Sequence, residues 1–168
     1  MKMIASLALA FGLAASAIAA DKDLPNFYPG AHIDEIIRVR LDRGDLLLES
    51  VLEAIQKFKI QDGALLTAVG SLQECTFHAV VTTDIKPVDK FTTVKEPMEI
   101  LNINGIIARG EPHFHMTLSS QKGAFGGHLE KGCKVLYLSE MTIAKFSGPP
   151  LQRKPDAQGV GKLQSRQD

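Results

Sequence analysis

The sequence predicts many β-strands and one helix, which places the protein in the α+β class. Three patterns lead to this prediction: segments in which apolar and polar residues alternate, an apolar run of strand length between two glycines, and one stretch with a helical period. The chain has 168 residues, of which 45% are hydrophobic. This length and composition suit a single domain with a substantial core.

The first elements follow in order. Residues 36–41, "IIRVRL", alternate as a half-buried strand does. In residues 44–58, "GDLLLESVLEAIQKF", apolar residues recur every three or four positions, which predicts a core helix with Asp45 as its N-cap. Residues 64–69 form the apolar run of a central strand, and residues 72–81 return to alternation. The sequence therefore predicts strand, helix, strand, strand.

The second half of the chain adds further strands. Residues 82–97 contain two prolines and many threonines, which predicts a loop or an irregular hairpin. Residues 98–110, 113–120 and 134–146 are strand candidates, the last of them almost wholly apolar and therefore central. Residues 147–168 have three prolines and no periodicity, which predicts a disordered tail.

The N-terminus has the composition of an export signal. Residues 1–20 join one early lysine to an apolar run that ends in small residues, as a secretory signal peptide does, with cleavage expected after Ala19 or Ala20. An uncleaved membrane anchor is the alternative. We expect a periplasmic or secreted protein with no stable membrane association after cleavage, residues 21–34 as a lead-in and residues 35–146 as the domain.

The two cysteines, Cys75 and Cys133, each lie among alternating apolar residues. A free thiol packs there as a small hydrophobic group. We therefore expect two buried free cysteines. A disulfide is the alternative, because an oxidising compartment would preserve it, but the Cα separation that it needs cannot be read from the sequence.

Three of the five histidines lie close together in the sequence. In a strand, His113 and His115 share one face, opposite the apolar residues between and beside them. His128 follows Gly126 and Gly127, whose missing side chains let the backbone turn tightly and approach another element. Three neutral imidazoles suit zinc or another divalent transition metal. The sequence predicts a metal site here, and the alternative is that these histidines are ordinary polar side chains on an exposed strand face.

Other polar residues accompany this cluster. Glu111 and Glu130 flank it and are the candidate catalytic residues, either as a base or as acceptors that orient an imidazole. His78 is expected on the solvated face of its strand, although a shared polar face would bring it near the other histidines.

The chain resembles the PPC domain family (plants and prokaryotes conserved, DUF296). The resemblance rests on "RLDRGDLLLESVLEAI", "GALLTAVGSL", "MEILNINGII" and "GEPHFHMTLSS…GAFGGHLEKGCKV", in that order. It implies a compact domain in which an antiparallel-rich mixed sheet packs with one main helix, assembled as a homotrimer. It also implies a metal-binding cluster formed by the H-x-H and G-G-H histidines, here His113, His115 and His128.

Nucleic acid is not an expected partner. Nineteen Lys and Arg residues balance nineteen Asp and Glu residues, so the chain has no basic field to neutralise phosphates. Plant members of the PPC family carry an Arg-Gly-Arg-Pro hook, whereas the nearest string here, "ARGEP", has an acid in place of the second arginine. A DNA-binding function, which the family label suggests, remains the alternative.

The leading interpretation is an exported, trimeric domain that binds a metal and a small-molecule ligand. Whether it is an enzyme is left open. A metal-dependent hydrolase or lyase is one alternative, with metal-bound water as the nucleophile or base. A cupin-like metal enzyme is another, although the glutamate expected shortly after the H-x-H is absent, since Ser119 and Ser120 stand there.

Overall fold

The structure, a computed structural model, describes residues 26–166. The predicted signal peptide and the first part of the lead-in lie outside the described residues. The elements are β1 (His32–Asp42), α1 (Leu47–Lys57), β2 (Asp62–Val80), β3 (Asp89–Val94), β4 (Met98–Ala108), β5 (Glu111–Ser120), β6 (Gly123–Leu129), β7 (Lys134–Ser147), β8 (Leu151–Pro155) and β9 (Gly161–Ser165). The expectation of many strands and one helix is confirmed for this part of the chain.

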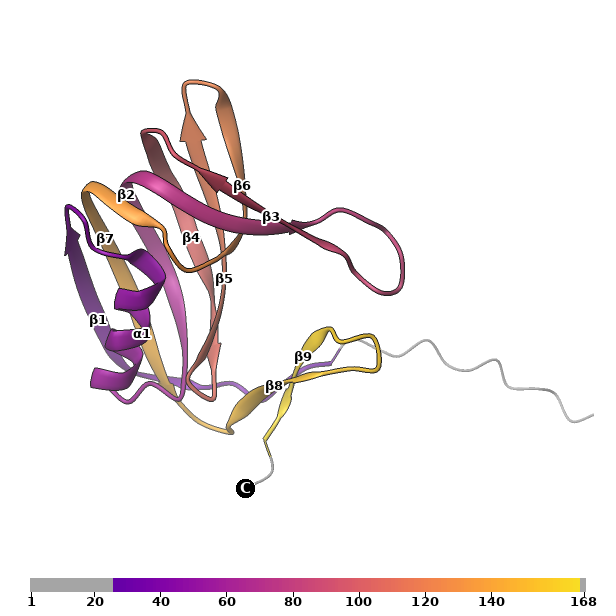
Figure 1. Ribbon diagram of the computed structural model, residues 1–168. Helices are drawn as coiled ribbons and strands as arrows, with labels where there is room; N and C mark the ends of the chain where they lie inside the picture. The colour runs from indigo at the N-terminus through magenta and orange to yellow at the C-terminus, as the bar shows by residue number, and fades with distance from the viewer. Residues whose placement is uncertain (1–25, 167–168) are drawn as a thin grey trace, which may run out of the picture.

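Seven of these strands form one antiparallel sheet, in the order β1-β7-β2-β4-β5-β6 with β3 paired to β2 (Figure 1). β6 pairs with β5 and also touches β2 at Phe77↔Leu129 and His78↔His128. Strands β2, β4, β5 and β6 therefore form a closed ring, in which the two ends of the chain segment from β2 to β6 meet.

β2 is one strand of 19 residues, where the sequence suggested two strands separated by Gly70. Gly70 has a φ of +142°, and a Cβ there would lie 2.3 Å from the backbone oxygen of Leu138. The glycine therefore allows a close approach between β2 and β7 within a continuous strand. It does not end the strand. The predicted irregular hairpin at residues 82–97 is the connection to β3, which pairs with the far end of β2.

Helix α1 packs its buried residues Leu47, Val51 and Ile55 toward the sheet, over β1, β7 and β2 in Figure 1. The prediction of Asp45 as the N-cap is wrong. The N-cap is Leu46, whose side chain makes no capping hydrogen bond. The Asp45 carboxylate instead accepts a hydrogen bond from the Asp42 N–H at 2.8 Å, so the turn after β1 uses it. Within residues 26–166, no helix has the length and apolar character needed to cross a membrane.

The expectation of free cysteines is also wrong, because Cys75 and Cys133 form a disulfide. Alternation along each strand correctly placed both side chains in the core, where they are fully buried. Their partnership depends on the register of β2 against the start of β7, which shifts between Leu72 and Glu74 and brings the two Cα atoms to 3.8 Å. Such a long-range register cannot be read from local alternation.

The predicted disordered tail is replaced, over residues 151–165, by the hairpin β8–β9. Its turn is fixed by the Asp156 carboxylate, which accepts hydrogen bonds from the N–H groups of Gln158 and Val160. The hairpin is attached to the domain where the Leu151 N–H donates to Asp62 at 3.1 Å. Local composition missed this segment because polar turn contacts and contacts with the sheet stabilise it in place of an apolar core of its own.

Candidate metal centre

The strand alternation predicted for His113 and His115 is confirmed on β5. Phe114 is 1% exposed and Met116 is 5% exposed, whereas His115 is exposed and His113 half-buried. The apolar side chains enter the core inside the strand ring, so the two imidazoles stand on its outer side.

His128 lies on β6, directly opposite His115 in the strand register. Its two preceding glycines are part of this strand, so the expected tight turn is wrong and the expected close approach is confirmed. A Cβ on Gly126 would lie 2.0 Å from the Met116 oxygen, and one on Gly127 would lie 2.3 Å from the His78 oxygen. The absence of side chains at these two positions allows β6 to fit between β5 and β2.

The three histidines meet in a geometry that suits one metal ion. Their ligand nitrogens all lie within 4.8 Å of one another, and the Nε2 atoms of His113 and His115 are 3.3 Å apart. Two nitrogens bound to a tetrahedral zinc ion at about 2.0–2.1 Å are separated by about 3.3–3.4 Å. The structure therefore brings together the three residues that the sequence selected, at a spacing that fits this donor set.

A fourth histidine, His78, belongs to the same cluster. It lies on β2 opposite His128, with the two ring centroids 4.5 Å apart. Its Nδ1 is 2.7 Å from Oε1 of Glu130, so the imidazole N–H donates to the carboxylate. His78, His128 and Glu130 form a second group whose ligand atoms lie within 4.8 Å of one another. Pairing of β2 with β6 half-buries His78, so its expected solvated position is wrong, whereas the stated alternative, a shared polar face that brings it near the other histidines, is confirmed.

The two glutamates that flank the cluster have different positions. Glu130 accepts a hydrogen bond from His78, a histidine outside the predicted set of three ligands. Glu111 is exposed at the start of β5, and its charge acts on Arg153. Neither glutamate is shown to be catalytic by this placement.

Arg153 is the functional candidate that sequence reasoning missed. It extends from β8, where its Nη1 donates to Nδ1 of His113 and its Nη2 donates to the backbone oxygen of Gly161. Arg153 is 40 residues from His113 and lies in a segment without periodicity, so no local signal pointed to it.

The surroundings keep two of the imidazoles neutral. Burial is the main cause that lowers the pKa of His113 to about 4, and the positive charge of Arg153 is the next. Burial also lowers the pKa of His128, followed by the effect of His78. Neutral imidazole is the form that binds a metal, so both residues hold a ligand nitrogen ready near neutral pH.

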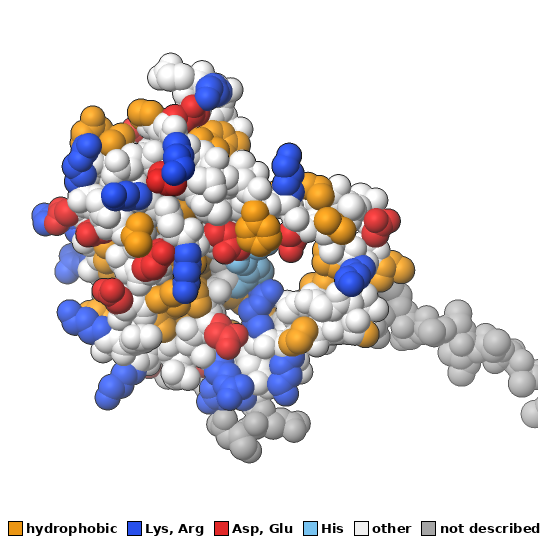
Figure 2. Space-filling model, viewed as in Figure 1, with side chains coloured by type: hydrophobic (Ala, Val, Ile, Leu, Met, Phe, Trp, Pro, Cys, Tyr) orange, Lys and Arg blue, Asp and Glu red, His pale blue; other side chains and the backbone are white. Residues whose placement is uncertain are grey.

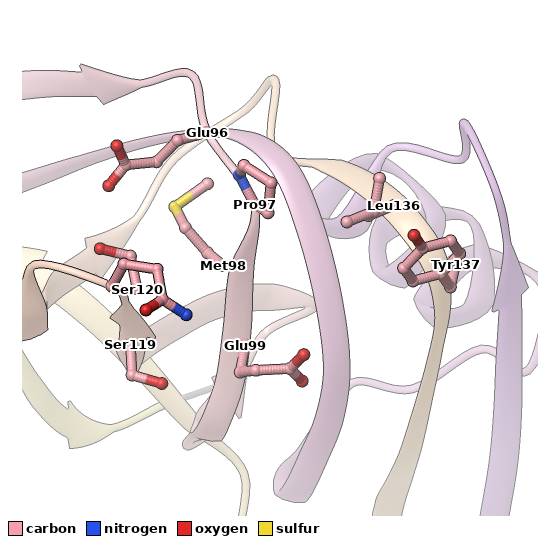
Figure 3. Close-up of a pocket in the computed structure, with 9 residues that line it drawn as sticks. Glu96, Pro97, Met98, Glu99, Ser119, Ser120, Leu136 and Tyr137 are labelled. Carbon is pink, nitrogen blue, oxygen red and sulfur yellow. The ribbon is translucent and has the colours of Figure 1, made fainter.

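Figure 2 shows the histidines as a patch in a hollow of the surface, with acidic and basic side chains beside it. A separate depression of about 440 Å³ lies between the start of β4, the end of β5 and β7 (Figure 3). Its lining residues are Glu96, Pro97, Met98, Glu99, Ser119, Ser120, Gln121, Leu136 and Tyr137. No histidine lines this depression, so the cluster is a distinct site.

The family model of the Plants and Prokaryotes Conserved (PCC) domain matches residues 28–147. The chain belongs to the PCC domain family. This is the family that the sequence motifs resembled, and the match covers every strand of the main sheet and the helix.

Solved structures share the PCC fold. A PPC protein from Pyrococcus horikoshii is 21% identical with a TM-score of 0.71, and the match covers 84% of this chain and 99% of that one. A metal-containing protein from Archaeoglobus fulgidus is 22% identical with a TM-score of 0.69, over 80% and 96%. A candidate DNA-binding protein from Bacteroides thetaiotaomicron is 18% identical with a TM-score of 0.69, over 80% and 96%. At identities this low, the likeness establishes the fold alone.

Two curated relatives are much longer proteins, and this chain matches only a small part of each. The chain is 28% identical over 123 residues to the bifunctional protein GlmU of one Synechococcus strain, and 28% identical over 119 residues to GlmU of another. These matches cover 73% and 70% of this chain but 18% of each relative. The chain therefore spans less than a fifth of the length of these relatives.

Proposed function

We propose that this PCC domain binds a divalent transition metal, zinc in the first place, through His113, His115 and His128, and holds a small-molecule ligand beside it. The observation that carries the proposal is the 3.3 Å separation of the His113 and His115 Nε2 atoms, within a group of three imidazoles. Zinc held by three protein ligands keeps a fourth position for water or a ligand, where it lowers the pKa of bound water. We assign no reaction to the site.

The choice of zinc follows from the donors. Imidazole suits zinc, copper, nickel and iron, and the set contains no thiolate, because both cysteines are in the disulfide. One of the fold neighbours, from Archaeoglobus fulgidus, is itself named as a metal-containing protein. This name supports a metal in the present chain without specifying which metal or which residues.

The protein is exported to the periplasm or secreted in this proposal. Disulfides persist in oxidising compartments and are rare in the cytosol. The Cys75–Cys133 disulfide supports the same location as the apolar N-terminal segment.

Self-association as a trimer is also proposed. Five large apolar side chains on the neighbouring strands β7, β2 and β4 are between 43% and 69% exposed: Leu66, Val69, Leu101, Tyr137 and Leu138. A soluble chain that covers these side chains with copies of itself gains stability from their burial. Light scattering at micromolar concentration tests this, and a monomer mass would contradict it.

Elemental analysis of the protein, purified from the periplasm without added metal, tests the metal proposal. We expect about one zinc, or one other transition metal ion, per chain. The metal-stripped protein should take up zinc in calorimetry with the same stoichiometry. A purified protein free of metal that also fails to bind added zinc would contradict the proposal.

DNA binding is the second candidate, because a fold neighbour carries that name. The zero formal net charge gives little electrostatic support for it. A gel-shift assay of the purified protein against duplex DNA at several salt concentrations separates the two functions. Tight binding that weakens steeply with salt would favour DNA as the partner.

A further inference from the structure

The C-terminal hairpin brings a guanidinium group to the histidine cluster. Arg153 donates to Nδ1 of His113 through one nitrogen and to the backbone oxygen of Gly161 through another. The Gly161 contact lies within the hairpin, and the Leu151 contact with Asp62 holds the base of β8 on the sheet. The side chain therefore extends toward the cluster from a hairpin attached to the sheet.

This guanidinium has no close acid to neutralise it. Among the residues that the structure describes, no carboxylate lies within ion-pair distance of Arg153, although the charge of Glu111 acts on it from farther away. Arg153 is partly buried. Its guanidinium carries a full charge, because arginine stays protonated in proteins. Its remaining N–H groups require acceptors.

The contact between Arg153 and His113 belongs to the metal-free site. When Nε2 of a neutral imidazole binds a metal, the ring proton is on Nδ1, which then donates. A guanidinium has only donors, so Arg153 loses its acceptor on His113 once Nε2 is engaged. Nη1 of the guanidinium then stands beside the metal position without its acceptor, while Nη2 keeps its contact with the backbone oxygen of Gly161.

The charges at this place call for an anion. Three neutral imidazoles would cancel none of the two positive charges of a divalent ion, and Arg153 adds a third, whereas the neighbouring donor group supplies one carboxylate, Glu130, which already accepts from His78. We propose that Arg153 makes the site selective for ligands with an oxyanion group, a carboxylate or a phosphate. One oxygen would face the open metal position and a second would accept from the guanidinium, whose N–H groups suit the oxygens of planar or tetrahedral anions. This inference rests on the proposed metal function.

The experiment uses the full-length protein loaded with cobalt, whose visible absorption reports a change of ligand. Acetate and inorganic phosphate are titrated separately into the wild type and into Arg153→Gln, Arg153→Lys and Lys154→Gln. Lys154 is the matched control, because it is the next residue on β8 and its side chain is exposed. Its substitution removes the same charge from the hairpin.

We expect at least one anion to change the wild-type spectrum. Arg153→Gln should lower the affinity for that anion by about tenfold or more, which is the effect of losing one charge-assisted hydrogen bond. Arg153→Lys keeps the charge without the fork and should fall between the two. Lys154→Gln should match the wild type. The anion that shows the larger dependence on Arg153 identifies the ligand as a carboxylate or a phosphate.

Equal anion affinity in the wild type and Arg153→Gln would overturn the inference while the metal site stands, and so would a wild-type spectrum that no anion changes. If the protein takes up no cobalt at all, both the metal site and this inference are wrong. If Arg153→Gln does not fold, Arg153→Lys decides: an affinity equal to that of the Lys154→Gln control would overturn the role of the fork.

Discussion

Two groups of potential metal ligands share His128, and they differ in whether a carboxylate accepts a hydrogen bond from one of their histidines. In the group formed with His113 and His115, the imidazoles face one another without a carboxylate. In the group formed with His78 and Glu130, the carboxylate already accepts the N–H of His78.

The difference indicates a division of roles. A carboxylate that holds the N–H of a histidine orients the ring and raises its basicity, as outer partners of metal sites do. In the proposed site the ion belongs to the three-histidine group, whose ring nitrogens contact no carboxylate in the described part of the chain. The His78–Glu130 pair positions His128, whose ring stacks on His78.

The largest effect is expected from His128→Ala, because this residue belongs to both groups. Loss of a residue that only orients a ligand lowers metal affinity by about 10- to 100-fold. The zinc affinity of His128→Ala, measured by calorimetry, should fall by more than this. His32→Ala is the matched control, since His32 is exposed on β1 and belongs to neither of the two donor groups. A His128→Ala protein that binds zinc as tightly as the control would contradict the shared role.

His115→Ala breaks only the three-histidine group and should remove most of the bound metal. The fold should remain intact, since His115 is exposed and surface substitutions change stability by about 0.5 kcal/mol or less. Metal analysis and thermal unfolding of the metal-free protein measure the two effects. Equal metal content in the wild type and in the alanine variants of His113, His115 and His128 would refute the site.

Glu130→Gln tests the second group and should lower zinc affinity by about tenfold, because the amide orients His78 less strongly than the carboxylate does. If His78→Ala loses the same zinc affinity and the double variant loses no more, the two residues act through the same interaction. If Glu130→Gln loses as much affinity as His128→Ala, the carboxylate is a direct ligand and the ranking of the two groups is reversed.

The smallest effect is on the stability of the metal-free protein at acidic pH. The folded protein lowers the pKa of His113 to about 4, from an ordinary value of about 6.5. Between these values the unfolded chain binds the proton that the folded chain does not, so stability should fall as pH decreases through this window. Urea unfolding of the wild type and His113→Gln at pH 7 and pH 5 measures it, with a weaker pH dependence expected for the variant.

Parts of the site that depend on residues close in sequence could be predicted, and parts that depend on pairing between distant strands could not. On β5, alternation alone placed His113 and His115 opposite Phe114, because the side-chain period of a strand is local. The joining of His78 to the cluster required β2 to pair with β6 at His78↔His128, and no local pattern encodes that pairing.

The same reason explains the errors elsewhere. β6 was missed because the glycines that allow its close packing lower the strand propensity of its sequence. The hairpin β8–β9 was missed because it has few apolar residues and no apolar periodicity, and Arg153 was missed with it. The elements that could be predicted are those whose own residues form the core, such as α1 and β4.

The disulfide has a consequence for covalent connectivity. It closes a ring between positions separated by 58 residues, and His78, His113, His115 and His128 are all members of this ring. In the chain-entropy model, closing a ring of this size destabilises the unfolded state by about 4 kcal/mol. An oxidised chain therefore begins folding with its four clustered imidazoles already confined to a single loop. Arg153 lies outside the ring and reaches the histidines only when the hairpin docks.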